Sequence, residues 1–122
     1  MELTVENRGG VCVITGKGEL DAGAAARLKE LFIKQVLHQR DRFVICMQDI
    51  VSIDSGGIGA LLFIASTVRR LALRYCFAAA PEPVMRVLEK IGIAGYFSFS
   101  GALEEALETL QDEEPEELLE FY

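Results

Sequence analysis

The chain passes from a predicted strand into a predicted helix at Ile53-Asp54-Ser55-Gly56-Gly57-Ile58-Gly59-Ala60-Leu61-Leu62. Asp54 or Ser55 is suited to cap this helix, because a short polar side chain accepts hydrogen bonds from first-turn N–H groups. The glycines allow the backbone to pack closely against a sheet. The helix is predicted to run to about Arg74, and its apolar spacing predicts a buried face made of Ile58, Leu61, Leu62, Ala65, Val68 and Ala72.

The residues before Ile53 predict two strands, a helix and a third strand. Residues 2–7 alternate apolar and polar, the turn signal Asn7-Arg8-Gly9-Gly10 follows, and residues 11–14 form an apolar run, which together indicate a hairpin. Glycines at 16 and 18 predict that the second strand ends there and that residues 19–21 form a loop. An amphipathic pattern then predicts a helix over 24–38, and a short apolar run predicts a central strand over 43–47.

The residues after residue 74 continue the alternation of strand and helix. We expect a strand over 75–80, a helix that begins at Pro81 and stops at Gly92, and a short strand at Tyr96-Phe97. Ser100 is predicted to cap a last helix. The fold class is therefore α/β: one domain with a central mixed sheet of about five strands, flanked by about four helices.

Composition supports a single globular domain. A chain of 122 residues with 51% hydrophobic and 25% charged residues is long enough to bury a core and is not disordered as a whole. Three widely spaced cysteines in apolar runs predict buried thiols in a reducing compartment, and neither a signal peptide nor a membrane span is evident. We therefore expect a cytoplasmic protein that does not enter a membrane.

Negative charge is concentrated at the C-terminal end. Residues 104–122 carry nine acids and no base, so that this segment has a charge of −9 and the rest, −7 + 9, has +2. Because clustered bases are absent, we expect no nucleic-acid partner. We divide the chain into a domain over 1–112 and an acidic tail over 113–122. The tail is either solvated or an adhesive for another protein or a second copy through Leu118, Leu119, Phe121 and Tyr122.

The sequence contains no recognisable catalytic or cofactor motif. A phosphate-binding loop is absent, and the pair Gly57-Ile58-Gly59 lacks the third glycine of a dinucleotide site, because Leu62 stands there. His38 is the only histidine, so neither a metal site nor a histidine-based triad is expected. We therefore predict a protein that is not an enzyme and that needs neither a cofactor nor a metal.

Two motifs together resemble those of a known family. Gly18-Glu19-Leu20-Asp21 precedes the first helix, and Asp54-Ser55-Gly56-Gly57-Ile58-Gly59 precedes the second. The pair resembles the anti-sigma-factor antagonists, the STAS domain family, whose usual motifs are Gly-Glu-Leu-Asp and Asp-Ser-Ser-Gly-Leu-Gly. The resemblance covers about residues 3–111.

This resemblance implies a bacterial regulator of transcription that works by partner switching. Such an antagonist binds an anti-sigma factor, often a serine-protein kinase, and so frees the sigma factor. The kinase phosphorylates a serine at the start of the second helix, and a phosphatase removes the phosphate. The partner-binding residues implied here are Asp21, Asp54, Ser55, Gly56, Gly57 and Ile58, and we expect both acidic corners to share one docking face.

The chain departs from the family at the phosphate acceptor. Gly56 stands at the usual acceptor position and has no hydroxyl, so Ser55 is only a displaced candidate. We therefore hypothesise a protein held in the unphosphorylated, binding-competent form. Two alternatives remain open: a STAS scaffold subunit of a stress-sensing or lipid-transport complex, and a small nucleotide-binding module. We expect a monomer or a weak homodimer.

Overall fold

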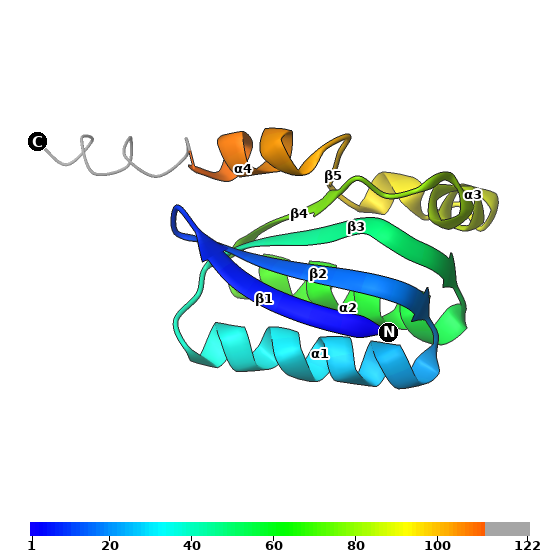
Figure 1. Ribbon diagram of the computed structural model, residues 1–122, viewed down its shortest axis with the longest axis horizontal. Coiled ribbons are helices and arrows are strands. Elements are labelled where there is room, and N and C mark those ends of the chain that lie inside the picture. Colours follow the sequence, from blue (N-terminus) through cyan, green and yellow to red (C-terminus); the bar gives the residue numbers. More distant parts are fainter. Residues whose placement is uncertain (112–122) are drawn as a thin grey trace, which may run out of the picture.

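The computed structural model describes residues 1–111, so the predicted tail over 113–122 lies outside the described residues. The chain runs through five strands, four α-helices and one short 3₁₀ helix (Figure 1). Their bounds are β1 Glu2–Arg8, β2 Val11–Leu20, α1 Ala22–Leu37, β3 Arg42–Ile53, α2 Ser55–Arg70, β4 Arg74–Ala78, α3 Glu82–Lys90, η1 Ala94–Tyr96, β5 Phe99–Ser100 and α4 Leu103–Gln111.

The strands form one mixed sheet in the order β1-β2-β3-β4-β5. β1 pairs with β2 in antiparallel fashion, and β2, β3, β4 and β5 are mutually parallel. Helices α1 and α2 lie on one side of the sheet and α4 lies on the other (Figure 1). The predicted class, a five-stranded mixed sheet flanked by four helices, is confirmed.

The two faces of the sheet carry separate apolar cores, because successive strand side chains point to opposite faces. In β3, Phe43, Ile45 and Met47 belong to the larger core beneath α1 and α2, and Val44 and Cys46 belong to the smaller core beneath α4. Both sets are buried, which is why this part of β3 is continuously apolar in sequence.

The second strand is longer than the glycines predicted. β2 continues through Gly16 and Gly18 to Leu20, because it pairs with β1 on one side and β3 on the other. Gly18 has a φ of +114°, a backbone conformation that favours glycine, and it lies at a register shift against β3. The predicted loop over 19–21 is therefore wrong: residues 19 and 20 are strand, and α1 begins at Ala22, two residues earlier than predicted.

Two further boundaries around the quoted motif differ from the prediction. β3 has twelve residues, Arg42–Ile53, and not five, because Asp49, Ile50, Ser52 and Ile53 continue the pairing with β2. α2 ends at Arg70, and Ala72 has a φ of +56°, which is incompatible with a helix. Leu62 and Ala72 were expected in the buried face, but both are exposed.

The segment after α3 was assigned wrongly. Tyr96-Phe97 is not a strand, because residues 94–96 form η1 and the pairing with β4 is made by Phe99 and Ser100. Ser100 does not cap α4 directly, since the helix begins three residues later at Leu103. Its hydroxyl instead contacts the carbonyl oxygen of Ala102 and the carboxylate of Glu105, at 3.0 Å each. β4 also ends two residues early, at Ala78.

The described residues offer little sign of membrane or metal chemistry. All three cysteines are buried free thiols. Within residues 1–111, none of the helices has both the length and the apolar character needed to cross a bilayer. Over the same residues, no group of three histidine, cysteine or acidic side chains converges in a way that could hold a metal ion.

Candidate functional site

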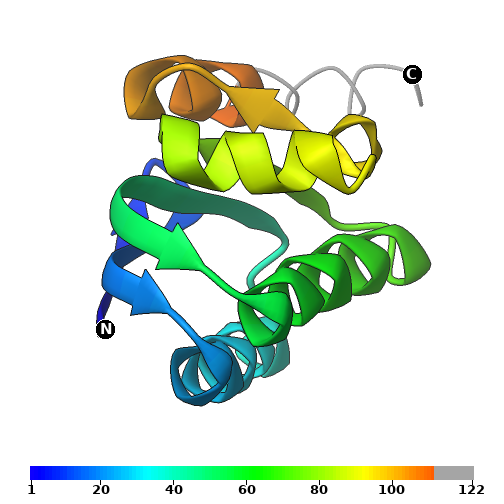
Figure 2. The ribbon, with the colours of Figure 1, turned by 90° about the vertical axis from the view of Figure 1, so that its right-hand side faces the viewer.

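The two acidic corners lie at the same edge of the sheet. Leu20, the last residue of β2, is the register partner of Ile53, the last residue of β3. Asp21 and Asp54 come next in each strand, and the Asp54 N–H donates to the Leu20 carbonyl oxygen at 3.3 Å. Parallel strands place both corners side by side, and Figure 2, which faces this edge, shows α1 and α2 beginning next to each other.

Each aspartate caps the helix that follows it. Asp21 Oδ1 accepts a hydrogen bond from the Ala24 N–H at 2.9 Å, and Asp54 Oδ1 accepts one from the Gly57 N–H at 3.0 Å. Both caps have extended backbones, with ψ of −173° in each case. Of the two cap candidates in the second motif, Asp54 is therefore the cap and Ser55 is the first helical residue.

Two glycines allow the start of α2 to approach its neighbours closely. A Cβ atom on Gly56 would lie 2.7 Å from the Ala22 Cα, at the start of α1. A Cβ atom on Gly57 would lie 2.3 Å from the Leu20 carbonyl oxygen, at the end of β2. Both distances are shorter than van der Waals contact, so only glycine fits at either position without a shift of the backbone.

The side chains at this edge differ in exposure. Asp21, Asp54 and Ser55 are exposed, Gly57 is buried, and Ile58 is half-buried and packed against the larger core. Within residues 1–111, the Ser55 hydroxyl takes part in no hydrogen bond and neither aspartate is in an ion pair. The edge therefore presents two exposed carboxylates and one exposed hydroxyl above two helix N-termini.

An apolar strip continues from this edge along α2. Leu62 lies one turn after Ile58 on the same helix face, since residues four apart are neighbours, and its exposed fraction is 36%. Val51, near the end of β3, has an exposed fraction of 61%. Sequence analysis missed both, because it assigned Leu62 to the core and ended the strand before Val51.

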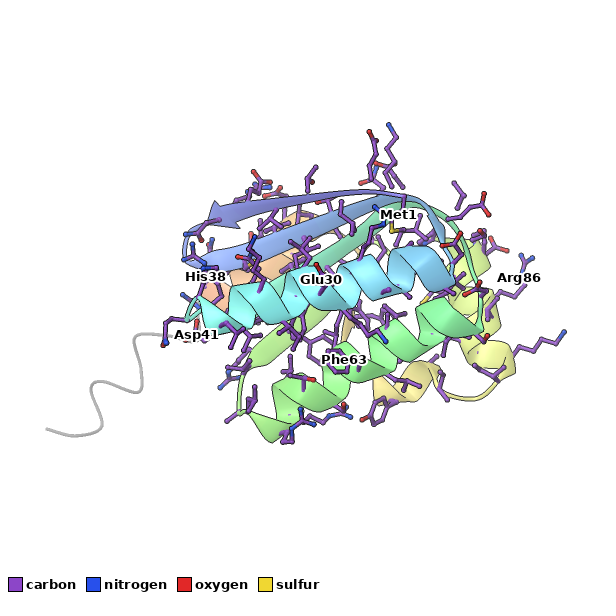
Figure 3. The ribbon with its side chains drawn as sticks, turned by 90° about the horizontal axis from the view of Figure 1, so that it is seen from below. Met1, Glu30, His38, Asp41, Phe63 and Arg86 are labelled. Carbon is purple, nitrogen blue, oxygen red and sulfur yellow. The ribbon has the colours of Figure 1, made fainter. Side chains whose placement is uncertain are left out.

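The contact between α1 and α2 fixes the two helix starts relative to each other. Phe63 of α2 stacks edge-on against Phe32 of α1, with 6.4 Å between ring centroids, and Lys29 lies 5.8 Å from the centre of the Phe63 ring. Figure 3 shows Phe63 between the two helices and Arg86 of α3 at the end where both helices begin. The Arg86 guanidinium is paired with the Glu82 carboxylate.

The residues of the two corners supply carboxylates, one hydroxyl and apolar surface. Exposed carboxylates beside a half-buried isoleucine and exposed leucine form a surface with a polar edge and an apolar strip, which is the composition of a protein interface.

The sequence matches the family model for the STAS domain over residues 2–106, and the chain belongs to this family. No curated protein sequence matches the chain. Among solved structures, an anti-sigma factor antagonist from Mycobacterium paratuberculosis has a TM-score of 0.81 at 22% identity, over 91% of this chain and 94% of its own.

Two further structures show the range of proteins that share the fold. The anti-sigma factor antagonist SpoIIAA, in its unphosphorylated form, has a TM-score of 0.71 at 21% identity, over 90% of this chain and 98% of its own. A sulfate transporter family protein from Wolinella succinogenes has a TM-score of 0.71 at 20% identity, over 88% of this chain and 92% of its own. At sequence identities of 20–22%, this structural similarity establishes that the proteins share a fold.

Proposed function

We propose that this protein is an anti-sigma-factor antagonist that binds an anti-sigma factor of the serine-kinase class through the edge formed by Asp21, Asp54, Ser55, Gly56, Gly57 and Ile58. The observation that carries the proposal is the side-by-side capping of α1 and α2 by two exposed aspartates. Structural relatives that are named anti-sigma factor antagonists support the same role. The protein acts by binding and performs no catalysis of its own.

We further propose that the docking surface is not switched by phosphate at the usual position. SpoIIAA has been solved in both an unphosphorylated and a phosphorylated form, so a protein of the same fold carries phosphate. Here Gly56 has no acceptor oxygen, and its close approach to Ala22 leaves no space for a side chain. Ser55 is exposed and is the displaced acceptor candidate, but a phosphate there would lie near two carboxylates of like charge, which disfavours its addition.

The partner is expected to carry a basic surface, because two unpaired carboxylates meet it. Aspartate-to-asparagine substitution tests this directly, since asparagine caps a helix about as well as aspartate does but carries no charge. The double variant Asp21→Asn/Asp54→Asn is therefore expected to fold normally and to bind the partner more weakly, by a factor that shrinks as salt is added.

The experiment is an affinity capture from the native cell with the tagged wild-type chain, followed by identification of the bound proteins. Recovery of an anti-sigma factor with a kinase fold by the wild type, and its loss with the double asparagine variant, is the expected result. An equally strong capture by the double variant would show that this edge is not the interface.

A second measurement tests the absence of the phosphate switch. The captured kinase and ATP are incubated with the chain, and the intact mass is measured. We expect no phosphoryl group, whereas stoichiometric phosphorylation that disappears in Ser55→Ala would assign the acceptor to Ser55 and overturn the unswitched form.

Possession of the fold by a sulfate transporter family protein favours one second candidate, a scaffold role in a larger assembly. That role predicts co-purification with such an assembly and no captured kinase.

A further inference from the structure

The outer side of β1 is an unpaired strand edge. Within residues 1–111, β1 stands at one end of the strand order and pairs only with β2. In Figure 3 it is the outermost strand, and no described helix or strand lies beyond it. Its pairing with β2 covers all seven residues in one register, without a bulge that would twist the edge away from further pairing. The outer side of β1 therefore offers a regular template for another strand.

The turn between β1 and β2 decides which backbone groups of β1 face outward. Its two glycines have φ of +58° and +84°, as in a two-residue type I′ turn, and Arg8 and Val11 flank them as register partners. The flanking pair of such a turn is hydrogen-bonded, and bonded pairs then alternate with non-bonded pairs along the two strands. The even-numbered residues of β1 therefore bond to β2, whereas Leu3, Val5 and Asn7 direct their N–H and C=O groups outward.

The charges of β1 match those of a second copy of β1 in one antiparallel register. When the two strands are centred on Val5, Glu2 of each copy lies opposite Arg8 of the other. A shift by two residues in one direction places Glu2 opposite Glu6, and a shift in the other direction places Glu6 opposite Glu6. Opposite charges across two strands stabilise the pair and like charges destabilise it. Charge therefore selects a second copy, centred on Val5, as the strand that fits this edge.

The side chains of β1 suit this register on both faces of the sheet. On the face of the larger core, Val5 has an exposed fraction of 38% and meets Val5 of the second copy, a β-branched pair of the kind that stabilises sheets. On the other face, Arg8 Nη2 donates to Glu104 Oε1 at 3.3 Å, and Arg8 Nη1 lies 3.9 Å from Glu6 Oε1. A guanidinium has five N–H donors, so Arg8 can also bind the Glu2 carboxylate of the second copy.

We infer that two copies of this chain pair through β1 as an antiparallel, two-fold symmetric dimer, with one sheet continuous through both copies. About six main-chain hydrogen bonds join the copies, two between the Val5 residues and two for each pairing of Leu3 with Asn7. One short strand from each copy makes a small interface, so the dimer is weak. Because the two copies run in opposite directions, their capped helix starts point away from each other. The inference is therefore independent of the proposed function.

Sedimentation velocity of the full chain, from micromolar to millimolar concentration, tests whether the dimer forms through this edge. The wild type is expected to dimerise as its concentration rises. Val5→Pro removes an N–H that faces outward and leaves the bonds to β2 in place, so it is expected to raise the dissociation constant of the dimer about tenfold. Val5→Thr keeps the N–H and is the matched control, and circular dichroism checks that both variants fold. A wild type that stays monomeric, or a dimer unaffected by Val5→Pro, would overturn the inference.

An exchange of charges tests the register. Glu2→Arg and Arg8→Glu each place like charges opposite each other at both ends of the pair, so each variant alone is expected to dimerise about tenfold more weakly at low salt. An equal mixture of the two variants restores opposite charges at both ends and is expected to associate about as strongly as the wild type. Glu89→Arg, the same charge change at an exposed position of α3, is expected to have no effect. A mixture that associates no better than either variant alone would contradict this register and overturn the inference.

Discussion

At the residue scale, the close approach of Gly56 to Ala22 is the feature that most separates this chain from the motif it resembles. A methyl group at position 56 would meet the α1 backbone, whereas at Gly59, also in α2, an added Cβ would meet nothing within 4 Å. Packing against α1 therefore requires glycine at position 56, whereas packing does not require glycine at position 59.

Gly56→Ala is expected to destabilise the protein by about 1–3 kcal/mol, because overpacking forces the helix starts apart. Gly59→Ala is the matched control and is expected to stabilise by about 0.5–1 kcal/mol, because alanine costs less conformational entropy in a helix. Urea unfolding of both variants measures the difference. Equal effects of the two substitutions would contradict the packing argument.

The buried thiols give a residue-scale prediction in pH. Burial, followed by the nearby Glu105 charge, raises the pKa of Cys76 to about 11 from the ordinary value of 9.0. Burial also raises the pKa of Cys12, and the charge of Arg40 opposes this in part. The thiolate is the reactive form, so both thiols are expected to resist alkylation in the native protein at mildly alkaline pH and to react readily in urea.

The same shift predicts a pH dependence of stability. As the pH rises from about 9 to about 11, the unfolded Cys76 thiol loses its proton before the folded one does. The free energy of unfolding is therefore expected to fall over this window and to fall less steeply in Cys76→Ala. Chemical denaturation of both proteins across the window measures the contrast, and parallel curves would refute it.

At the element scale, the aspartates that cap α1 and α2 are also the residues of the proposed docking surface. Asp54→Ala is expected to lower the free energy of unfolding by about 1 kcal/mol, because the Gly57 N–H loses its acceptor. Asp54→Asn keeps an acceptor and is expected to cost only a few tenths of a kcal/mol. Denaturant midpoints distinguish the two, and an alanine variant as stable as the asparagine variant would show that the cap contributes nothing.

Sequence predicted these elements well where the signal is local. Short polar residues after a strand and before glycines restrict the cap to Asp54 or Ser55 from neighbouring residues alone, and the structure assigns it to Asp54. β5 was misplaced because a two-residue strand has no periodicity, and only its pairing with Phe77 defines it. The packing role of Gly56 depends on Ala22, which is remote in sequence, so no local pattern could reveal it.

At the scale of the whole molecule, the two faces of the sheet are unequally covered. Twenty-one described residues make up the buried core under α1 and α2, whereas nine make up the core under α4. The C-terminal end of α4 is held by Arg42, a buried guanidinium that donates to the Leu110 carbonyl oxygen at 3.0 Å. A small core and one buried anchor indicate that α4 opens before the rest of the domain.

Leu107→Ala removes a buried side chain from the smaller core and is expected to reduce the protection of α4 amides by about 2–5 kcal/mol in opening free energy. Amides of α1 and α2 should change less. Native-state hydrogen exchange measures both sets, and a uniform loss of protection would show that the domain opens as a single unit.

The contact between Gly56 and Ala22 also constrains how the protein could change by mutation. A serine introduced at position 56 would supply an oxygen for phosphate, but its Cβ would collide with the Ala22 main chain and not only with the methyl group. Replacement of Ala22 by glycine would therefore remove only part of this collision, and the first turn of α1 or of α2 would have to shift. A phosphate acceptor at position 56 is therefore expected to need an accompanying change in the packing of α1 against α2.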